Sequence, residues 1–187
     1  KPAAATLPAL LEPRPNATAR LAILFTSDKG LCGSYNINIL RQTLKYLENT
    51  QAHGQKVHFF VIGKKGRDFL ANHQFHIEKE YVNYLRRPSF AQAEVLGQEI
   101  INYYLDHREI AQVDVLFMDF RSALRQLPAL YSLIAPSLPS GQTIKEEPFD
   151  YLYEPGREVI LEELLPRYVK TQLYRLIFES YTSEQAS

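Results

Sequence analysis

The sequence has almost no cysteine, no excess of either charge and no long apolar run. Its single cysteine among 187 residues, Cys32, excludes an internal disulfide and any multi-cysteine zinc site. Lys plus Arg and Asp plus Glu both number 21, so the formal net charge is zero. That balance argues against a dedicated nucleic-acid binder, whose affinity comes mainly from neutralising phosphates.

Membrane and export signals are also missing from the sequence. No apolar run approaches the roughly 18 residues that span a bilayer, and no polybasic cluster marks a membrane address. The start, Lys1–Ala5, lacks the apolar core of a signal peptide. We therefore expect no direct membrane insertion and a reducing, cytosol-facing compartment. The first residue is not Met, which indicates processing or excision from a longer chain.

The residues that are present suit an ordinary globular domain. Hydrophobic residues make up 45% and charged residues 22%, and the length fits one domain, with or without an appendage. Short apolar or alternating runs predict strands, and apolar positions spaced by three or four predict helices. The strands are expected at 21–26, 57–62, 75–82, 113–120 and 129–135, and the helices at 37–47, 67–73, from 88 to about 104, and after 158. This alternation predicts an α/β fold with a Rossmann-like, open, mostly parallel sheet and helices on both faces.

The organisation along the chain has three parts. Residues 1–19 hold four prolines and are expected to form an arm or linker outside the core. Residues 20–165 form the predicted globular domain, although 139–158 are rich in turn residues. Residues 166–187 are expected to form the start of a C-terminal shaft helix, where Pro166 either occupies the first helical turn or kinks a longer helix that begins at Glu158. Its apolar stripe is Val169, Leu173, Leu176, Ile177 and Tyr181. The stripe predicts either a longer helix that meets a partner helix or simple packing on the domain's own sheet.

The segment Ser27–Gly33 follows the first predicted strand, where open α/β sheets bind ligands. A nucleotide- or FMN-binding, flavodoxin-like module is therefore one interpretation. The glycine spacing matches neither G-x-G-x-x-G nor G-x-x-x-x-G-K-[ST], so turn geometry at Gly30 and Gly33 is the competing one. Cys32 as a phosphatase-type nucleophile would need an arginine six residues on, where Asn38 stands. We predict no catalytic residue, no cofactor-binding residue and no metal ligand.

Five motifs in order resemble the gamma subunit family of F-type ATP synthases. The run Thr26–Asn36 resembles its signature loop, and Ile62–Gly66 resembles its second strand-to-turn segment. Pro88–Phe90 resembles a helix entry, and Leu164–Tyr168 and Glu179–Ala186 resemble the start of its C-terminal helix. The resemblance covers roughly residues 20–187.

The resemblance implies a non-catalytic central-stalk, or rotor, subunit. It would couple proton translocation through the membrane sector to ATP synthesis and hydrolysis in the catalytic head. The family's first long helix is absent here, and its C-terminal helix would continue into a coiled-coil shaft. The chain therefore resembles the globular domain alone, and it is either a fragment cut from its shaft or a truncated natural paralogue. The paired regulatory cysteines of the chloroplast form are absent too.

Partners and site residues follow from the same resemblance. The implied partners are the epsilon subunit, the membrane ring of proteolipid subunits, and the alpha/beta head, the last mostly through the missing shaft. The implied location is peripheral, on the cytoplasmic or equivalent matrix or stromal face of an energy-coupling membrane, with the isolated fragment soluble. The signature-loop residues, expected to be structural or interfacial, are Ser27, Asp28, Lys29, Gly30, Leu31, Cys32, Gly33 and Asn36. The residues matched to the start of the shaft helix are Pro166, Arg167, Tyr168, Ser183 and Glu184.

Overall fold

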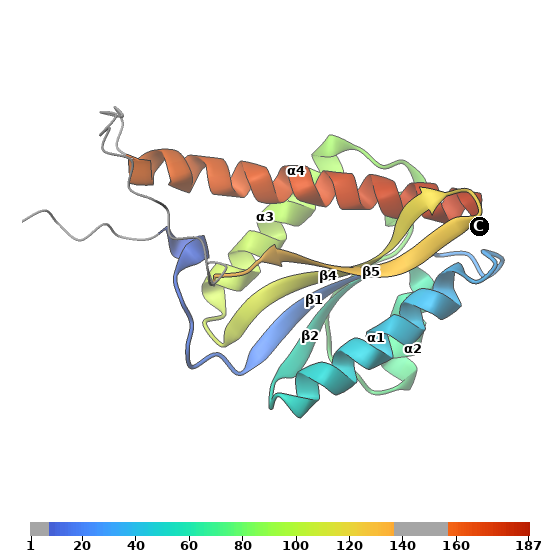
Figure 1. Ribbon diagram of the computed structural model, residues 1–187, viewed down its shortest axis with the longest axis horizontal. Coiled ribbons are helices and arrows are strands. Elements are labelled where there is room, and N and C mark those ends of the chain that lie inside the picture. Colours follow the sequence, from blue (N-terminus) through green and yellow to red (C-terminus); the bar gives the residue numbers. More distant parts are fainter. Residues whose placement is uncertain (1–7, 137–156) are drawn as a thin grey trace, which may run out of the picture.

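The computed structural model describes residues 8–136 and 157–187, and it shows the α/β alternation that the sequence predicted (Figure 1). The strands are β1 (Ala19–Phe25), β2 (Lys56–Ile62), β3 (Ile77–Tyr81), β4 (Ile110–Ser122) and β5 (Arg125–Ile134). The helices are α1 (Tyr35–Ala52), α2 (Lys64–Asn72), α3 (Phe90–Asp106) and α4 (Arg157–Ala186), with short 3-10 turns η1 (Ala9–Leu11) and η2 (Tyr84–Arg86). The predicted fold class is therefore confirmed.

The five strands form one sheet in the order β3-β2-β1-β4-β5. The first three neighbouring pairs are parallel, and β5 alone runs antiparallel, beside β4. Only two residues, 123 and 124, connect β4 to β5, and so short a link can join antiparallel strands but not parallel ones. The order of the first four strands is that of a Rossmann sheet, whose ligand crevice lies between the ends of β1 and β4.

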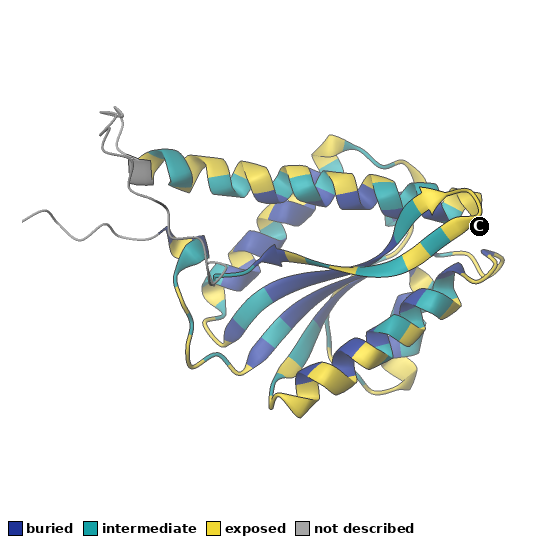
Figure 2. Ribbon diagram, viewed as in Figure 1, coloured by how far each residue is buried: buried dark blue, intermediate teal, exposed yellow. Residues whose placement is uncertain are grey.

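Helices cover both faces of the sheet, α1 and α2 on one and α3 and α4 on the other (Figure 1). Strand β1 lies at the centre and contributes to the core on each side. Leu21, Ile23 and Phe25 face α3 and α4, whereas Ala22 and Leu24 face α1. All five are completely buried, as expected for a parallel strand covered on both faces, and Figure 2 shows this buried centre.

The segment before β1 contributes to the core, so the expectation that residues 1–19 lie outside it is wrong for the described part. Leu10, in η1, is buried in the cluster shared with α3 and α4. The Arg14 side chain donates a hydrogen bond of 3.0 Å to the backbone oxygen of His107. The prolines leave this segment without long regular structure, but a single apolar side chain suffices to fix a turn against a neighbouring helix.

Helix α4 begins at Arg157, close to the start expected at 158, and Pro166 lies inside it as the tenth residue, so of the two interpretations of Pro166 the longer helix is the one observed. A proline in a helix interior removes one backbone hydrogen bond and crowds the preceding turn, but a long helix retains its remaining bonds. The turn-rich interpretation of residues 139–158 falls outside the described residues except at its last two positions.

The apolar stripe of α4 packs on the chain's own domain, which was one of the two interpretations that the sequence left open. Helix α4 contacts α3, β4 and β5. The buried members of its stripe are Val169, Leu173, Leu176 and Ile177, and the same face continues into two fully buried serines, Ser180 and Ser183. The helix is therefore part of the domain over at least four turns.

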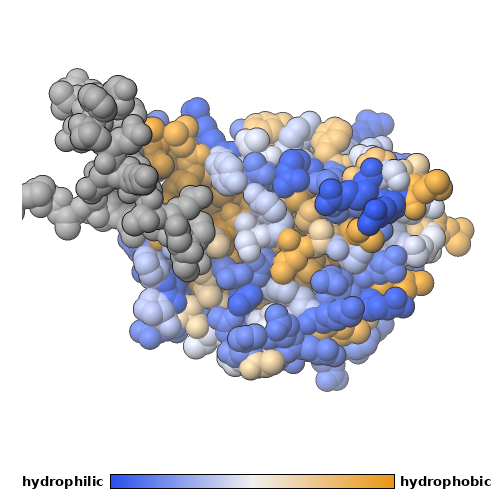
Figure 3. Space-filling model, viewed as in Figure 1, coloured by the Kyte–Doolittle hydropathy of each residue, from blue (hydrophilic) through white to orange (hydrophobic). Residues whose placement is uncertain are grey.

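Several of the exposed apolar side chains lie near the two ends of α4 and on the β4–β5 hairpin. Figure 3 shows apolar residues near both ends of α4 and a more hydrophilic surface over α1. The exposed set includes Leu124, Leu127, Val159 and Leu164. No helix among the described residues combines the length and the apolar character needed to cross a bilayer.

Candidate functional site

The signature loop, residues 26–36, lies at the carboxyl edge of the parallel strands. It connects β1 to α1, and three distant segments meet it there: the turn between β2 and α2, the residues after β3, and the end of α4. The last of these is visible in Figure 1, where the blue loop lies near the red end of α4. This is the edge at which open α/β sheets bind their ligands.

Asp28 joins the signature loop to the N-terminus of α2 and to the residues after β3. Its Oδ1 accepts a hydrogen bond of 2.9 Å from the backbone N–H of Lys64, the first residue of α2. Its Oδ2 accepts one of 2.9 Å from the backbone N–H of Asn83. Free N–H groups and the helix dipole make a helix N-terminus an anion site, and a carboxylate of the chain itself occupies this one.

Thr26 holds the turn between β2 and α2 against the end of β1. Its Oγ1 donates to the backbone oxygen of Ile62 at 2.9 Å and accepts from the backbone N–H of Gly66 at 2.8 Å. Gly63 has φ +98°, and a Cβ placed there would lie 2.2 Å from the Thr26 oxygen. Only glycine fits so close an approach with a positive φ. Thr26 and Gly63 are absent from the predicted site, although the Gly63–Gly66 turn was the available signal.

Ser27 links the loop to the end of α4. Its buried Oγ donates to Oε1 of Glu184 at 2.8 Å and accepts from the backbone N–H of Lys29 at 2.9 Å. The Cys32 Sγ lies 3.2 Å from the same oxygen. Asn36 closes the loop from α1, since its Oδ1 accepts from the Ser27 N–H at 3.0 Å. One buried hydroxyl therefore joins the loop to a helix 157 positions away.

The end of α4 packs on β4 and on the loop that follows β1, and a cavity of about 380 Å³ lies beside it, bordered by Asp28 and Glu184. The Tyr35 hydroxyl donates to the backbone oxygen of Ser180 at 3.3 Å, and the Ser183 hydroxyl donates to the backbone oxygen of Met118 in β4 at 3.0 Å. Burial, and to a lesser extent the Glu184 carboxylate, raises the pKa of the Tyr35 phenol, which therefore stays neutral. Small serine side chains allow this close approach of helix to sheet.

The loop has a buried side and an exposed tip. Cys32 is 4% exposed and belongs to the core cluster beneath α1, whereas Leu31 is 99% exposed. Lys29, Gly30 and Gly33 are also exposed. The buried residues of the loop therefore stabilise the fold, and only its exposed tip can contact a partner protein.

The second predicted group of residues is divided between the two ends of α4. Ser183 and Glu184 join the signature loop, but Pro166, Arg167 and Tyr168 lie about 25 Å away along the helix. The Tyr168 hydroxyl lies 3.3 Å from the hydroxyl of Tyr131 in β5. The structure therefore brings two of these five residues to the loop and leaves three at the far end of the helix.

The strand order and the helices on both faces define a Rossmann-like α/β domain. The family model described as ATP synthase matches residues 3–187, and the chain therefore belongs to the ATP synthase family. Two similar curated relatives are both named ATP synthase gamma chain. The one from Nitratidesulfovibrio vulgaris strain Hildenborough is 37% identical over 183 residues, and the one from Syntrophobacter fumaroxidans is 34% identical over 180. Each alignment covers 95% of this chain and 61% of the relative, so the chain spans about three fifths of their length.

Solved structures share the fold. The central stalk and c-ring structure of Tetrahymena thermophila mitochondrial ATP synthase contains a chain that matches with a TM-score of 0.69 and 21% identity, covering 91% of this chain and 73% of that one. A chain in the rotor of Euglena gracilis mitochondrial ATP synthase matches with a TM-score of 0.65 and 18% identity, covering 91% and 64%. At these identities the likeness establishes the common architecture.

Proposed function

We propose that this chain is the globular part of the gamma subunit in the central stalk of an F-type ATP synthase. In this role it performs no bond chemistry and transmits torque between proton translocation in the membrane sector and ATP synthesis or hydrolysis in the catalytic head. The observation that carries the proposal is the identity of up to 37% with curated gamma chains across 95% of the chain. The hydrogen bonds that join the signature loop to α2 and to the end of α4 support a structural role.

The contacts of the signature loop suit a part that must resist twisting. Asp28 ties the loop to α2, Thr26 ties it to the turn after β2, and Ser27 ties it to α4 through Glu184. Hydrogen bonds between elements far apart in sequence restrict their relative motion, and the bond from Thr26 is fully buried. A helix held by these hydrogen bonds would transmit torque to the sheet with little relative motion between the two.

The proposed partners are the membrane ring of proteolipid subunits, the alpha/beta head and the epsilon subunit. The matched Tetrahymena structure is described as a central stalk with its c-ring, which supports the ring as a partner. The exposed Leu31 and the exposed hairpin residue Leu124 are apolar side chains of the kind that partners cover. The complex would lie peripherally on the cytoplasmic or equivalent face of an energy-coupling membrane.

The competing proposal is a nucleotide- or FMN-binding module, favoured by the position of the loop after β1. The Asp28 carboxylate would repel a phosphate at the start of α2, and the Glu184 carboxylate borders the same cavity. We therefore expect neither ATP nor FMN to raise the unfolding temperature of the chain. Stabilisation that increases with ligand concentration would favour the binding module instead.

A chimeric subunit tests the proposed function directly. Residues 3–187 replace the matching part of the Nitratidesulfovibrio vulgaris gamma chain, and the complex is reconstituted with its other subunits in vesicles. We expect ATP-driven proton pumping to be retained, because the rotor domain would be replaced by its equivalent. An assembled complex that hydrolyses ATP but pumps no protons would contradict the proposal.

A further inference from the structure

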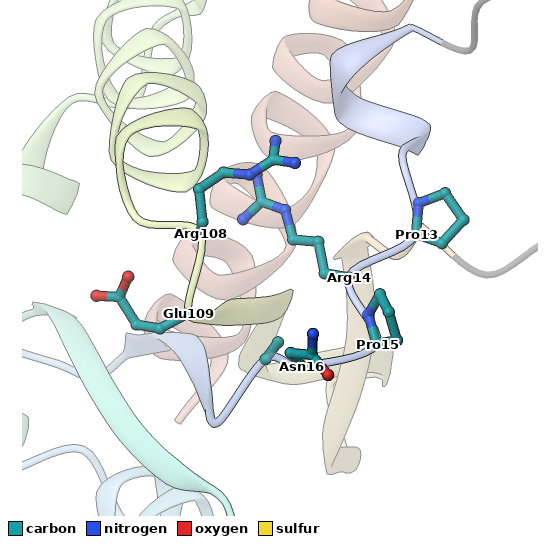
Figure 4. Close-up of a pocket in the computed structure, with 7 residues that line it drawn as sticks. Pro13, Arg14, Pro15, Asn16, Arg108 and Glu109 are labelled. Carbon is teal, nitrogen blue, oxygen red and sulfur yellow. The ribbon is translucent and has the colours of Figure 1, made fainter.

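A cavity of about 400 Å³ lies at the edge of the sheet opposite to the signature loop. It forms where the segment before β1 meets the connection from α3 to β4, at the amino ends of two parallel strands. Its polar lining consists of Arg14, Asn16, Arg108 and Glu109 (Figure 4). The proposed rotor function assigns no role to this cavity.

The Arg14 guanidinium is held firmly but incompletely hydrogen-bonded. Its Nη1 donates to the backbone oxygens of His107 and Ile110 at 3.0 and 2.9 Å, and its Cζ lies 3.6 Å from the ring centroid of Tyr104. Its Nε and Nη2 are buried and have no acceptor among the described residues. The hydroxyl of the fully buried Tyr104 has no partner among them either. Buried donors without acceptors are costly and call for an explanation.

A second arginine lies against the first. Figure 4 shows the guanidinium groups of Arg14 and Arg108 next to each other, with the Glu109 carboxylate directed away. Burial lowers the pKa of Arg14, and the charge of Arg108 lowers it further. Arg108 is 62% exposed and donates to Glu12 at 3.2 and 3.3 Å, which are long, exposed contacts. Two like charges are therefore held next to each other, and the exposed contact between Arg108 and Glu12 offsets their repulsion only weakly.

We propose that this cavity binds the phosphate group of a small anionic ligand between Arg14 and Arg108. Guanidinium groups bind phosphate oxygens through paired, charge-assisted hydrogen bonds. On binding, Arg108 exchanges Glu12 for the anion, which opens the path to Nε and Nη2 of Arg14 and supplies their missing acceptors. The volume lies within the range of roughly 300–1,000 Å³ typical of small-molecule sites. A free phosphate compound and a lipid headgroup present the same chemistry.

The test measures thermal unfolding and calorimetric binding of the 187-residue chain in potassium phosphate, against potassium chloride of equal ionic strength. Phosphate should stabilise the chain, and Arg108→Gln should weaken binding by about tenfold or more, the effect expected from losing charge-assisted hydrogen bonds. Arg121→Gln is the matched control, because Arg121 is 66% exposed and also pairs with one carboxylate, that of Asp119. Glu12→Gln should tighten binding, because it removes the competitor for Arg108.

Vesicles distinguish the two sources of phosphate. Co-sedimentation with vesicles of phosphatidylglycerol in phosphatidylcholine, compared with phosphatidylcholine alone, reports headgroup binding, and Arg108→Gln should abolish it if the ligand is a lipid. A response to free phosphate without vesicle binding identifies a soluble ligand. The proposal is overturned if neither probe binds, or if Arg108→Gln and Arg121→Gln behave alike. It is also overturned if Glu12→Gln leaves phosphate affinity unchanged.

Discussion

Single residues at the signature loop carry a conformational demand that ordinary side chains cannot meet. Gly63 combines φ +98° with a backbone oxygen 2.2 Å from the position of a Cβ. Gly54 also has a positive φ, +73°, but no atom lies within 4 Å of its Cβ position. Substitutions at the two glycines therefore distinguish the free-energy cost of the backbone conformation alone from the added cost of a steric clash.

We expect Gly63→Ala to lower the free energy of unfolding by about 3 kcal/mol or more, since a clash adds to the strained backbone. Gly54→Ala, with strain alone, should cost about 1 kcal/mol. Urea unfolding of the three proteins measures both values. Equal losses at the two positions would show that the β2–α2 turn does not press on Thr26.

At the scale of elements, α4 consists of a docked part and a part before it. The first buried side chain of its apolar stripe is Val169, and the exposed Leu164 precedes it. Pro166 lies between them, inside the helix. The hydrogen bond that a proline removes falls in the turn that leads into the docked part.

We expect Pro166→Ala to raise hydrogen-exchange protection of amides 161–165 while changing the urea midpoint of the whole domain little. The substitution restores one helical hydrogen bond, and local openings before the docked part are independent of global unfolding. Arg167→Ala, an exposed neighbour in the same helix, should leave protection unchanged. A loss of several kcal/mol in Pro166→Ala would mean that the proline sets a bend required for docking.

The docking of α4 on β4 should depend on pH through Glu179. Burial raises the pKa of this carboxyl to about 7, and contact with the Asp119 carboxyl contributes, while Arg175 acts in the opposite direction. A raised pKa means that the folded state binds more protons than the unfolded state between about pH 4.5 and 7. Stability from this group is therefore full below about 4.5 and is lost as the pH rises through 7.

Urea midpoints measured from pH 4.5 to 8 should fall less steeply in Glu179→Gln than in the unmodified chain, because glutamine does not titrate. Glu163→Gln, an exposed position on the same helix, should reproduce the original slope. Identical slopes in all three proteins would rule out Glu179 as the titrating group.

The sequence predicted the elements better than their contacts. Periodicity identified four strands near their observed bounds, but β5 starts at Arg125, earlier than expected, because Pro128 within the run weakened the strand pattern. The position of the loop at the strand ends followed from the strand–loop–helix order. The hydrogen bond between Ser27 in the loop and Glu184 could not be predicted, because a contact between residues 157 positions apart leaves no local signal in the sequence. Arg14 was likewise missed, as its role depends on the distant His107.

At the scale of the whole molecule, the sheet separates two regions of different character. At the carboxyl edge, Asp28 caps α2 and the end of α4 bonds to the signature loop, which suits a rigid structural junction. At the amino edge, two arginines border an unfilled cavity. A role as a rotor domain requires the rigid junction at the carboxyl edge and surfaces of the domain itself that bind partner subunits.

Size-exclusion chromatography with light scattering, on a mixture of this chain and the epsilon subunit from the same source, tests that account most directly. We predict a one-to-one complex, because the globular domain of a central stalk should dock epsilon on its own surface. Variants at the arginine cavity provide an internal control and should bind epsilon equally well. Two separate peaks at concentrations where both proteins are folded would contradict the account.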